Sequence, residues 1–169
     1  ANSLLFTNAT PSFVDIEETT FWLNPKLISG KTSTSTKAIL PMDYGGQSCK
    51  IDEISKIARD EKLLLIEDAA ESLGSSINSN KVGSFSDASI FSFCGNKVLT
   101  TGEGGAIVTN SKEIYEKVKL IRSHGRLDSI TYFSNTSESQ YEELRYNWRM
   151  SSITAALGIA KLKKLDKKI

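Results

Sequence analysis

One stretch of the chain, residues 51–70, reads IDEISKIARDEKLLLIEDAA and carries the clearest secondary-structure signals. From Ile51 to Ala58 the apolar residues recur at the spacing of one face of an amphipathic helix. The continuous apolar run Leu63–Ile66 has the length of a strand and is typical of a strand buried on both faces in a parallel sheet. A helix followed by such a strand is a building unit of an α/β fold, which is the fold class that we predict.

Further elements are expected on both sides of this unit. The patterns predict strands at residues 11–16, 37–41, 88–93 and 105–109, a loop with a short helix at 17–36, a helix from Asn110 to Gly125, a polar loop at 126–145 and a helix from Ser151. The opening residues, beginning with Ala1, resemble the middle of an element. We therefore expect the chain to be a piece of a longer protein.

The bulk composition excludes several classes of protein. The 169 residues suffice for one domain or most of one. With 21 basic and 20 acidic residues there is no charge surplus of the kind that binds nucleic acid or an anionic membrane, and no apolar run approaches the roughly 20 residues of a membrane span. Two cysteines and one histidine are too few for a disulfide framework or a zinc site. We expect a cytoplasmic protein without a metal site.

The buried strand is followed directly by Asp68. In open α/β sheets ligands bind beyond the carboxyl ends of the strands, so this carboxylate lies where a ligand would bind. The alternative is that Asp68 only caps a following helix.

A second pattern combines a lysine with glycines and hydroxyls. Residues 92–97 read SFCGNK and residues 100–105 read TTGEGG, next to the strands predicted at 88–93 and 105–109. Glycines and hydroxyls beside a strand can bind a phosphate, although glycine-rich hairpins also form without a ligand. Lys97 by itself would be interpreted as a solvated surface residue.

The two patterns together indicate a more specific chemistry. Pyridoxal phosphate (PLP) requires a lysine for a Schiff base, a carboxylate for its pyridinium nitrogen and donors for its phosphate. Lys97, Asp68 and Ser92 are candidates for these three functions.

Several blocks of sequence then identify a family resemblance. In order and spacing they resemble the DegT/DnrJ/EryC1/StrS aminotransferases. The blocks are Ile66–Glu71, Val82–Phe85, Phe91–Lys97, Thr100–Ala106, Ser123–Arg126 and Tyr146–Met150, closed by Ala155–Gly158.

The resemblance implies an aspartate-aminotransferase type of fold (fold type I), a homodimer, and transfer of an amino group from glutamate to a keto-sugar nucleotide. It also implies that residues 1–169 form an incomplete PLP-binding large domain. The family's upstream Gly-Thr pair, which completes the phosphate cup, and its small C-terminal domain have no counterpart in this sequence.

The resemblance also assigns the site residues. Lys97 matches the Schiff-base lysine and Asp68 the pyridinium partner, which lies 97 − 68 = 29 positions earlier. Ser92 matches a hydroxyl that binds the phosphate. Ala70 and Glu71 match positions near the ring face and its 3-hydroxyl.

Two more matches lie in the block at residues 146–150. Asn147 matches an asparagine that reaches the phosphate bound by the neighbouring subunit, and Arg149 matches a nearby substrate-side arginine. Without the resemblance, Asn147 would be interpreted as a turn cap and Arg149 as a partner of Glu142 or Glu143. His124 also falls in a family block, and both a structural and a functional role remain open for it.

Three functional alternatives follow. The Gly95-Asn96-Lys97 spelling and Glu71 resemble a perosamine-synthetase-like branch, which aminates C4 of a 4-keto-6-deoxy sugar nucleotide. Some 3-dehydratases of the family share the fold and cofactor but carry histidine in place of the lysine, so Lys97 argues against them. A non-catalytic fragment or a regulatory binding module of the same fold is the third alternative.

Overall fold

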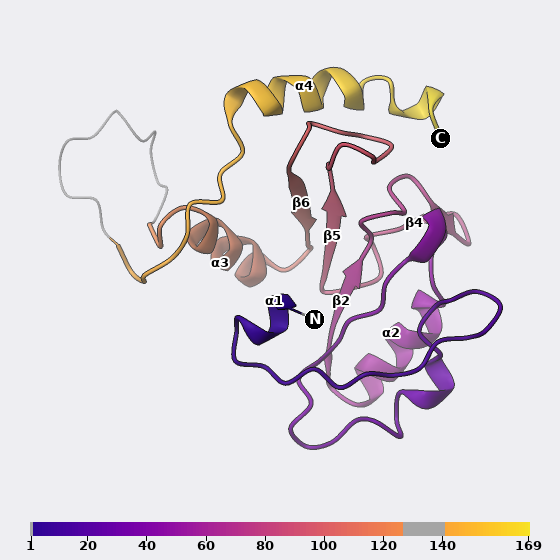
Figure 1. Ribbon diagram of the computed structural model, residues 1–169. Coiled ribbons are helices and arrows are strands. Elements are labelled where there is room, and N and C mark those ends of the chain that lie inside the picture. The colour runs from indigo at the N-terminus through magenta and orange to yellow at the C-terminus, as the bar shows by residue number, and fades with distance from the viewer. Residues whose placement is uncertain (1, 127–140) are drawn as a thin grey trace.

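The computed structural model describes residues 2–126 and 141–169 (Figure 1). Its centre is a four-stranded sheet in the order β1-β2-β5-β6. The strands β1, β2 and β5 are parallel, and β6 runs antiparallel to β5. Their bounds are Ala38–Ile39, Leu64–Asp68, Ala88–Ser92 and Gly105–Val108. The predicted α/β class is thus confirmed, with one antiparallel edge strand added.

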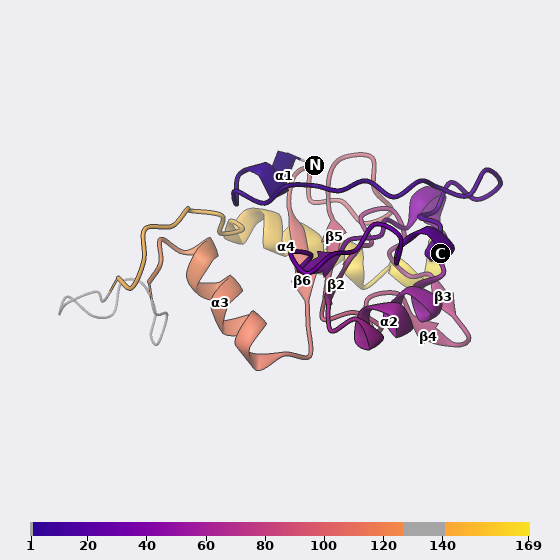
Figure 2. The same ribbon diagram turned by 90° about the horizontal axis from the view of Figure 1, so that it is seen from below.

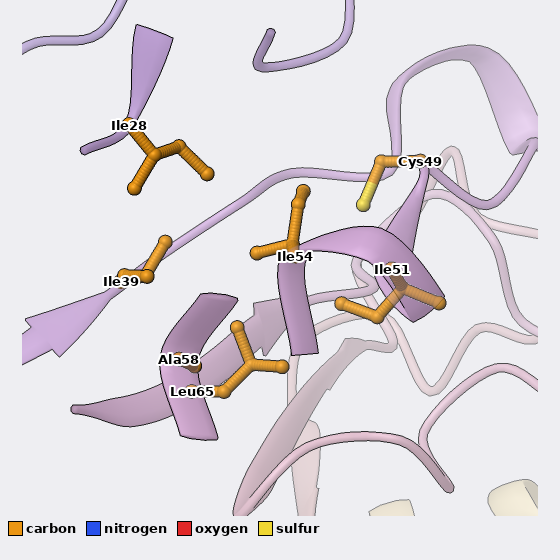
Figure 3. Close-up of a cluster of buried hydrophobic side chains, with 7 residues drawn as sticks. All are labelled: Ile28, Ile39, Cys49, Ile51, Ile54, Ala58 and Leu65. Atoms are coloured by element: carbon orange, nitrogen blue, oxygen red, sulfur yellow. The ribbon is translucent and has the colours of Figure 1, made fainter. Parts of the chain in front are cut away.

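Helix α2 (Ile51–Asp60) covers one face of the sheet. Its buried residues include Ile51, Ile54 and Ala58, as the sequence periodicity predicts. Figure 3 shows these side chains packed together with the others of the same cluster, which are Ile28, Ile39, Cys49 and Leu65. Since full burial of an isoleucine contributes about 1.5–3 kcal/mol, this cluster is a main source of stability for the sheet.

Two further helices begin at serine caps. Helix α3 (Lys112–Arg122) is capped by Ser111, whose side chain accepts a hydrogen bond from Ile114 N, so its start lies just after the predicted Asn110. Helix α4 (Ser152–Leu162) is capped by the predicted Ser151. Figure 1 shows α4 crossing the end of the sheet at which β2 and β5 finish, and Figure 2 gives the view from below. No helix in the described ranges is both long and apolar enough to span a bilayer.

Short elements account for the remaining described structure. A helical turn, α1 (Asn2–Leu5), stands at the start, and the short helix predicted within residues 17–36 is η1 (Pro25–Leu27). Two more 3-10 turns are η2 (Tyr44–Gly46) and η3 (Leu165–Lys167). Of the predicted loop at 126–145, residues 127–140 lie outside the described part of the chain.

Two strand predictions are wrong in part. Residues 11–16 form no strand, because the segment has no ladder partner and only Ile16 makes an isolated bridge, to Leu23. The strand β2 is not buried on both faces: Leu65 is 2% exposed but Leu64 is 52% exposed, since α2 covers only one side.

A hairpin lies outside the predicted elements. Strands β3 (Ser76–Ile77) and β4 (Asn80–Lys81) pair through a two-residue turn at Asn78 and Ser79, whose φ angles are 48° and 65°. Positive φ at both positions is the geometry of the tight hairpin turn that twisted strands favour. Asparagine at the first position is its usual sequence signal, and Ser79 in place of glycine weakens it.

Candidate active site at the carboxyl edge of the sheet

Asp68 closes strand β2 and is held by backbone contacts. Its N–H donates to Pro41 O at 2.9 Å, and its carbonyl accepts from Asp43 N at 3.0 Å. Its side-chain Oδ1 accepts from Ala70 N at 3.2 Å. No helix lies between residues 69 and 87, all of which the structure describes, so the helix-capping alternative for Asp68 is wrong.

Ser92 ends the neighbouring strand on the same face of the sheet. Asp68 pairs with Ile90 in the parallel ladder, and Ser92 lies two residues further along β5. Side chains two residues apart on a strand share a face. The hydroxyl Oγ of Ser92 accepts from Cys94 N at 3.3 Å, and this leaves its proton available to a ligand.

Lys97 is directed toward the connection that follows β2. Its Nζ lies 3.5 Å from Oε1 of Glu71, and its side chain is only 20% exposed. Oε2 of Glu71 accepts in turn from Gly45 N at 3.0 Å. The solvated-surface interpretation of Lys97 is therefore wrong, because this lysine is held at the same edge as Asp68 and Ser92.

The electrostatics of Glu71 follow from the same contacts. The hydrogen bond from Gly45 lowers the pKa of Glu71, partial burial opposes this change, and the positive charge on Lys97 lowers the pKa further. A carboxylate that stays ionised beside Lys97 orients the lysine side chain and offsets its charge.

The glycine stretch builds the hairpin that carries Lys97. Gly102 and Gly104 have φ angles of 85° and 140°, which favour glycine. The N–H of Gly102 already donates to Thr100 Oγ1 at 2.9 Å, and Thr101 N donates to Phe93 O at 3.0 Å. These contacts favour the alternative in which the glycines shape a tight turn, and the N–H of Gly102 is not left for a phosphate.

The block Tyr146–Met150 pairs through its backbone with the end of α3, and at its last residue Met150 it lies against Gly104. The backbone around exposed Asn147 pairs with the end of α3, through His124 N to Tyr146 O and Trp148 N to Arg122 O, both at 2.8 Å. In the part of the chain that the structure describes, Asn147 makes no hydrogen bond to Asp68, Ser92 or Lys97.

Arg149 and His124 both contribute to this junction. Arg149 Nη1 donates to Ser123 Oγ at 3.5 Å. The alternative interpretation expects Glu142 or Glu143 as its partner, and of these Glu143 pairs with Lys117 and Arg145. His124 adopts a φ of 61° and bonds through its backbone, which favours a structural role.

Sequence analysis did not identify two buried carboxylates, Asp43 and Glu67, as structurally important. Asp43 accepts from Cys49 N at 2.8 Å and from Ser72 Oγ at 2.7 Å, and so ties together the segments that follow β1 and β2. Glu67 accepts three hydrogen bonds on Oε2. Burial raises the pKa of Glu67, and the hydrogen bond from Ser89 opposes the rise. The sequence did offer a signal for Glu67. It comes one residue before Asp68 in a strand, so its side chain must point to the face opposite to that of Asp68.

Comparisons with known proteins identify the family of this chain. The model of the DegT/DnrJ/EryC1/StrS aminotransferase family matches residues 1–169. A UDP-4-amino-4,6-dideoxy-N-acetyl-beta-L-altrosamine transaminase of Campylobacter jejuni is 44% identical over 168 residues, which are 98% of this chain and 43% of that protein. A GDP-perosamine synthase of Caulobacter vibrioides is 40% identical over 166 residues, again 98% and 43%.

Solved structures show the same relationship. Helicobacter pylori PseC, described as an aminotransferase involved in the biosynthesis of pseudoaminic acid, superposes with a TM-score of 0.91 at 37% identity. The match covers 99% of this chain and 43% of that one, so the chain spans less than half the length of these relatives. The predicted fold class, an incomplete large domain of the PLP-dependent sugar aminotransferase type, is confirmed. The protein belongs to the DegT/DnrJ/EryC1/StrS aminotransferase family.

Proposed function

We propose that the full-length protein is a PLP-dependent aminotransferase that transfers an amino group from glutamate to a keto-sugar nucleotide. The observation that supports this proposal most is that Asp68 and Ser92 end neighbouring strands, while Lys97 lies 3.5 Å from Glu71, three positions after Asp68. The reaction would serve cell-surface or secondary-metabolite sugar biosynthesis. A cytoplasmic location remains a prediction.

The residues at this edge fit PLP. In the described contacts, Asp68 uses only Oδ1, so Oδ2 can accept a hydrogen bond from the pyridinium nitrogen. The Ser92 hydroxyl can donate to a phosphate oxygen, and the Lys97 amine can bind the cofactor's aldehyde carbon. When bound, PLP supplies an electron sink for the carbon that exchanges the amino group.

Each residue contributes a separate function. The carboxylate of Asp68 would keep the ring nitrogen of the cofactor positively charged. The amine of Lys97 would hold the cofactor and would carry protons to and from the reacting carbon. Ala70 and Glu71 come two and three positions after Asp68, so they would line the same edge near the ring. These assignments rest on the family match and on the proximity of the residues.

The substrate class is proposed from the relatives. The two curated relatives are named for UDP- and GDP-linked amino sugars. We therefore assign a nucleotide sugar as acceptor, with C4 of a 4-keto-6-deoxy sugar as the aminated carbon and Arg149 on the substrate side. The protein would be a homodimer in which Asn147 reaches the phosphate in the other subunit's site.

The proposal is tested by chemical labelling. Full-length protein loaded with PLP should be yellow, and borohydride reduction followed by peptide mapping should place the pyridoxyl group on Lys97. A label on Lys81 or Lys112 would contradict the assignment. A colourless protein that binds no PLP would favour the non-catalytic alternative.

A product assay separates the aminotransferase from the dehydratase. With glutamate and a 4-keto-6-deoxy nucleotide sugar, we expect an amino sugar and 2-oxoglutarate in equal amounts. Loss of the sugar's 3-hydroxyl without net amine transfer would favour the dehydratase.

A further inference from the structure

We infer that Glu67 is a positioning residue: it fixes the strand that carries Asp68 to the strand that carries Ser92, and so sets the spacing between the two ends of the cofactor site. This inference rests on the proposed function, because it assigns Asp68 to the ring of PLP and Ser92 to its phosphate.

The side chain of Glu67 lies beneath the site. Strand alternation turns Glu67 toward the covered face of β2, which it shares with Leu65, while Asp68 faces the other side. Glu67 is 0% exposed. It therefore contacts neither solvent nor the face on which a ligand would bind, and any effect on the cofactor must act through its neighbours.

Three donors from different parts of the chain converge on one oxygen of this carboxylate. Oε2 accepts from Gly83 N at 3.0 Å, from Ser86 Oγ at 3.2 Å and from Ser89 Oγ at 2.7 Å. The two serine hydroxyls also lie 2.6 Å apart, and because each has a single proton, Ser86 donates either to Glu67 or to Ser89. Ser89 is also the ladder partner of Glu67 across β2 and β5.

The connection between the two strands explains why this network matters. Parallel strands are usually joined by a helix that packs on the sheet. Between β2 and β5, residues 69–87 form only the β3–β4 hairpin and turns. Glu67 thus bonds to the connection at Gly83 and Ser86 and to the strand itself at Ser89, and provides an attachment that a packed helix would otherwise give.

The close packing at Gly83 adds a second constraint. A Cβ at this position would lie 3.0 Å from Cζ of Phe91, one residue before Ser92. The N–H of Gly83 is thus held by Glu67 while its Cα lies against β5. Loss of the carboxylate would leave this N–H and two hydroxyls without their acceptor, and the register of Ser92 relative to Asp68 would relax.

The experiment compares ligands that use one end of the site or both. In full-length Glu67→Gln, a neutral amide of nearly the same shape replaces the carboxylate, so the three donors lose a charged acceptor and keep at most a neutral one. The dissociation constants of PLP and of pyridoxal, which lacks the phosphate, are measured by absorbance titration of the cofactor-free protein. We expect PLP binding to weaken by about tenfold, the range for a lost charge-assisted hydrogen bond, and pyridoxal binding to weaken by much less.

Two controls keep the outcome decisive. Ser84→Ala, which removes an exposed serine in the same connection, should leave both constants unchanged. If Glu67→Gln does not fold, Ser89→Ala removes the shortest of the three hydrogen bonds. This variant should also weaken the binding of PLP more than that of pyridoxal, by a smaller factor.

The contrary results are equally clear. If only the unfolding temperature falls while both constants stay at wild-type values, Glu67 is a stability residue without a positioning role. If the binding of PLP and the binding of pyridoxal weaken by the same factor, Glu67 does not set the spacing between the two ends of the site. Failure of wild-type protein to bind PLP at all would overturn the proposed function instead, which distinguishes the two.

Discussion

The carboxyl edge of the sheet and the segment 146–150 differ in how their candidate residues are held. At the edge, Asp68 and Ser92 end the neighbouring strands β2 and β5, and Lys97 lies in the connection from β5 to β6, where it pairs with Glu71. In the segment 146–150, Asn147 is exposed and its neighbours bond to the end of α3. The first region assembles itself within one chain, whereas the second presents its groups outward, as a residue that serves another subunit would require.

The largest expected effect concerns Lys97. Lys97→Ala removes both the covalent anchor and the proton carrier, so we expect kcat to fall by about 10⁴-fold, the upper range for loss of a proton-transfer group. Steady-state kinetics of full-length protein with glutamate measures the change. Lys81→Ala, at an exposed lysine on β4, is the matched control and should keep wild-type activity. Substantial turnover in Lys97→Ala would contradict the assignment of the reaction centre to the carboxyl edge of the sheet.

Asp68 should have the next largest effect. Asp68→Ala removes the counter-charge of the pyridinium, and a lost electrostatic stabiliser of this kind costs about 10²-fold in kcat. Asp60→Ala, at an exposed aspartate on α2, serves as the control for a lost carboxylate. Near-normal turnover in Asp68→Ala would show that this strand end does not tune the ring.

The variant Asn147→Ala tests whether the segment 146–150 acts across a subunit interface. Asn147→Ala should weaken PLP binding by about tenfold, since it loses a hydrogen bond to a charged group. At a PLP concentration that leaves the Asn147→Ala parent largely without cofactor, mixing it with Lys97→Ala should then restore activity to roughly a quarter of wild type, because half of randomly exchanged dimers are hybrids with one intact site of two.

The contrary outcome of the mixing experiment is also informative. If subunits exchange, each parent is impaired and activity does not rise above the sum of the parents, Asn147 acts in its own chain's site or outside the site. The contrast between the two regions would then reflect only the exposure of this segment.

The smallest expected effect is the pH dependence of two glutamates in the first region. The pKa of Glu71 lies below its ordinary value of 4.5, so its contribution to the free energy of unfolding is present above pH 4.5 and is lost as the pH falls through the lowered pKa. The pKa of Glu67 lies above 4.5, so its contribution is fully present below pH 4.5 and is lost as the pH rises through the raised pKa.

Urea unfolding of wild type, Glu71→Gln and Glu67→Gln across this pH range measures both contributions. We expect the difference in the free energy of unfolding between wild type and variant to change with pH in opposite directions for Glu71 and Glu67. Equal slopes would mean that the two carboxylates do not differ in burial and contacts as the structure describes.

Sequence reasoning succeeded where structure is local. The helix at Ile51–Asp60 and the strand ending at Asp68 follow from apolar spacing, and adjoining strand ends place Asp68 near Ser92. The same reasoning failed for residues 11–16, since alternation predicts a strand but cannot supply the partner that a strand needs. It also placed both faces of β2 in a core, although α2 covers only one of them.

By itself, the sequence determined the family and the residue types at the ends of the strands, because motifs and periodicity are properties of short segments. Only the tertiary structure decided that Lys97 meets Glu71, 26 positions earlier, and that Glu67 binds Gly83, Ser86 and Ser89 beneath the site. Such contacts depend on the path of the chain between the strands. That path is fixed by burial and by hydrogen bonds between residues far apart in sequence, which local spacing does not encode.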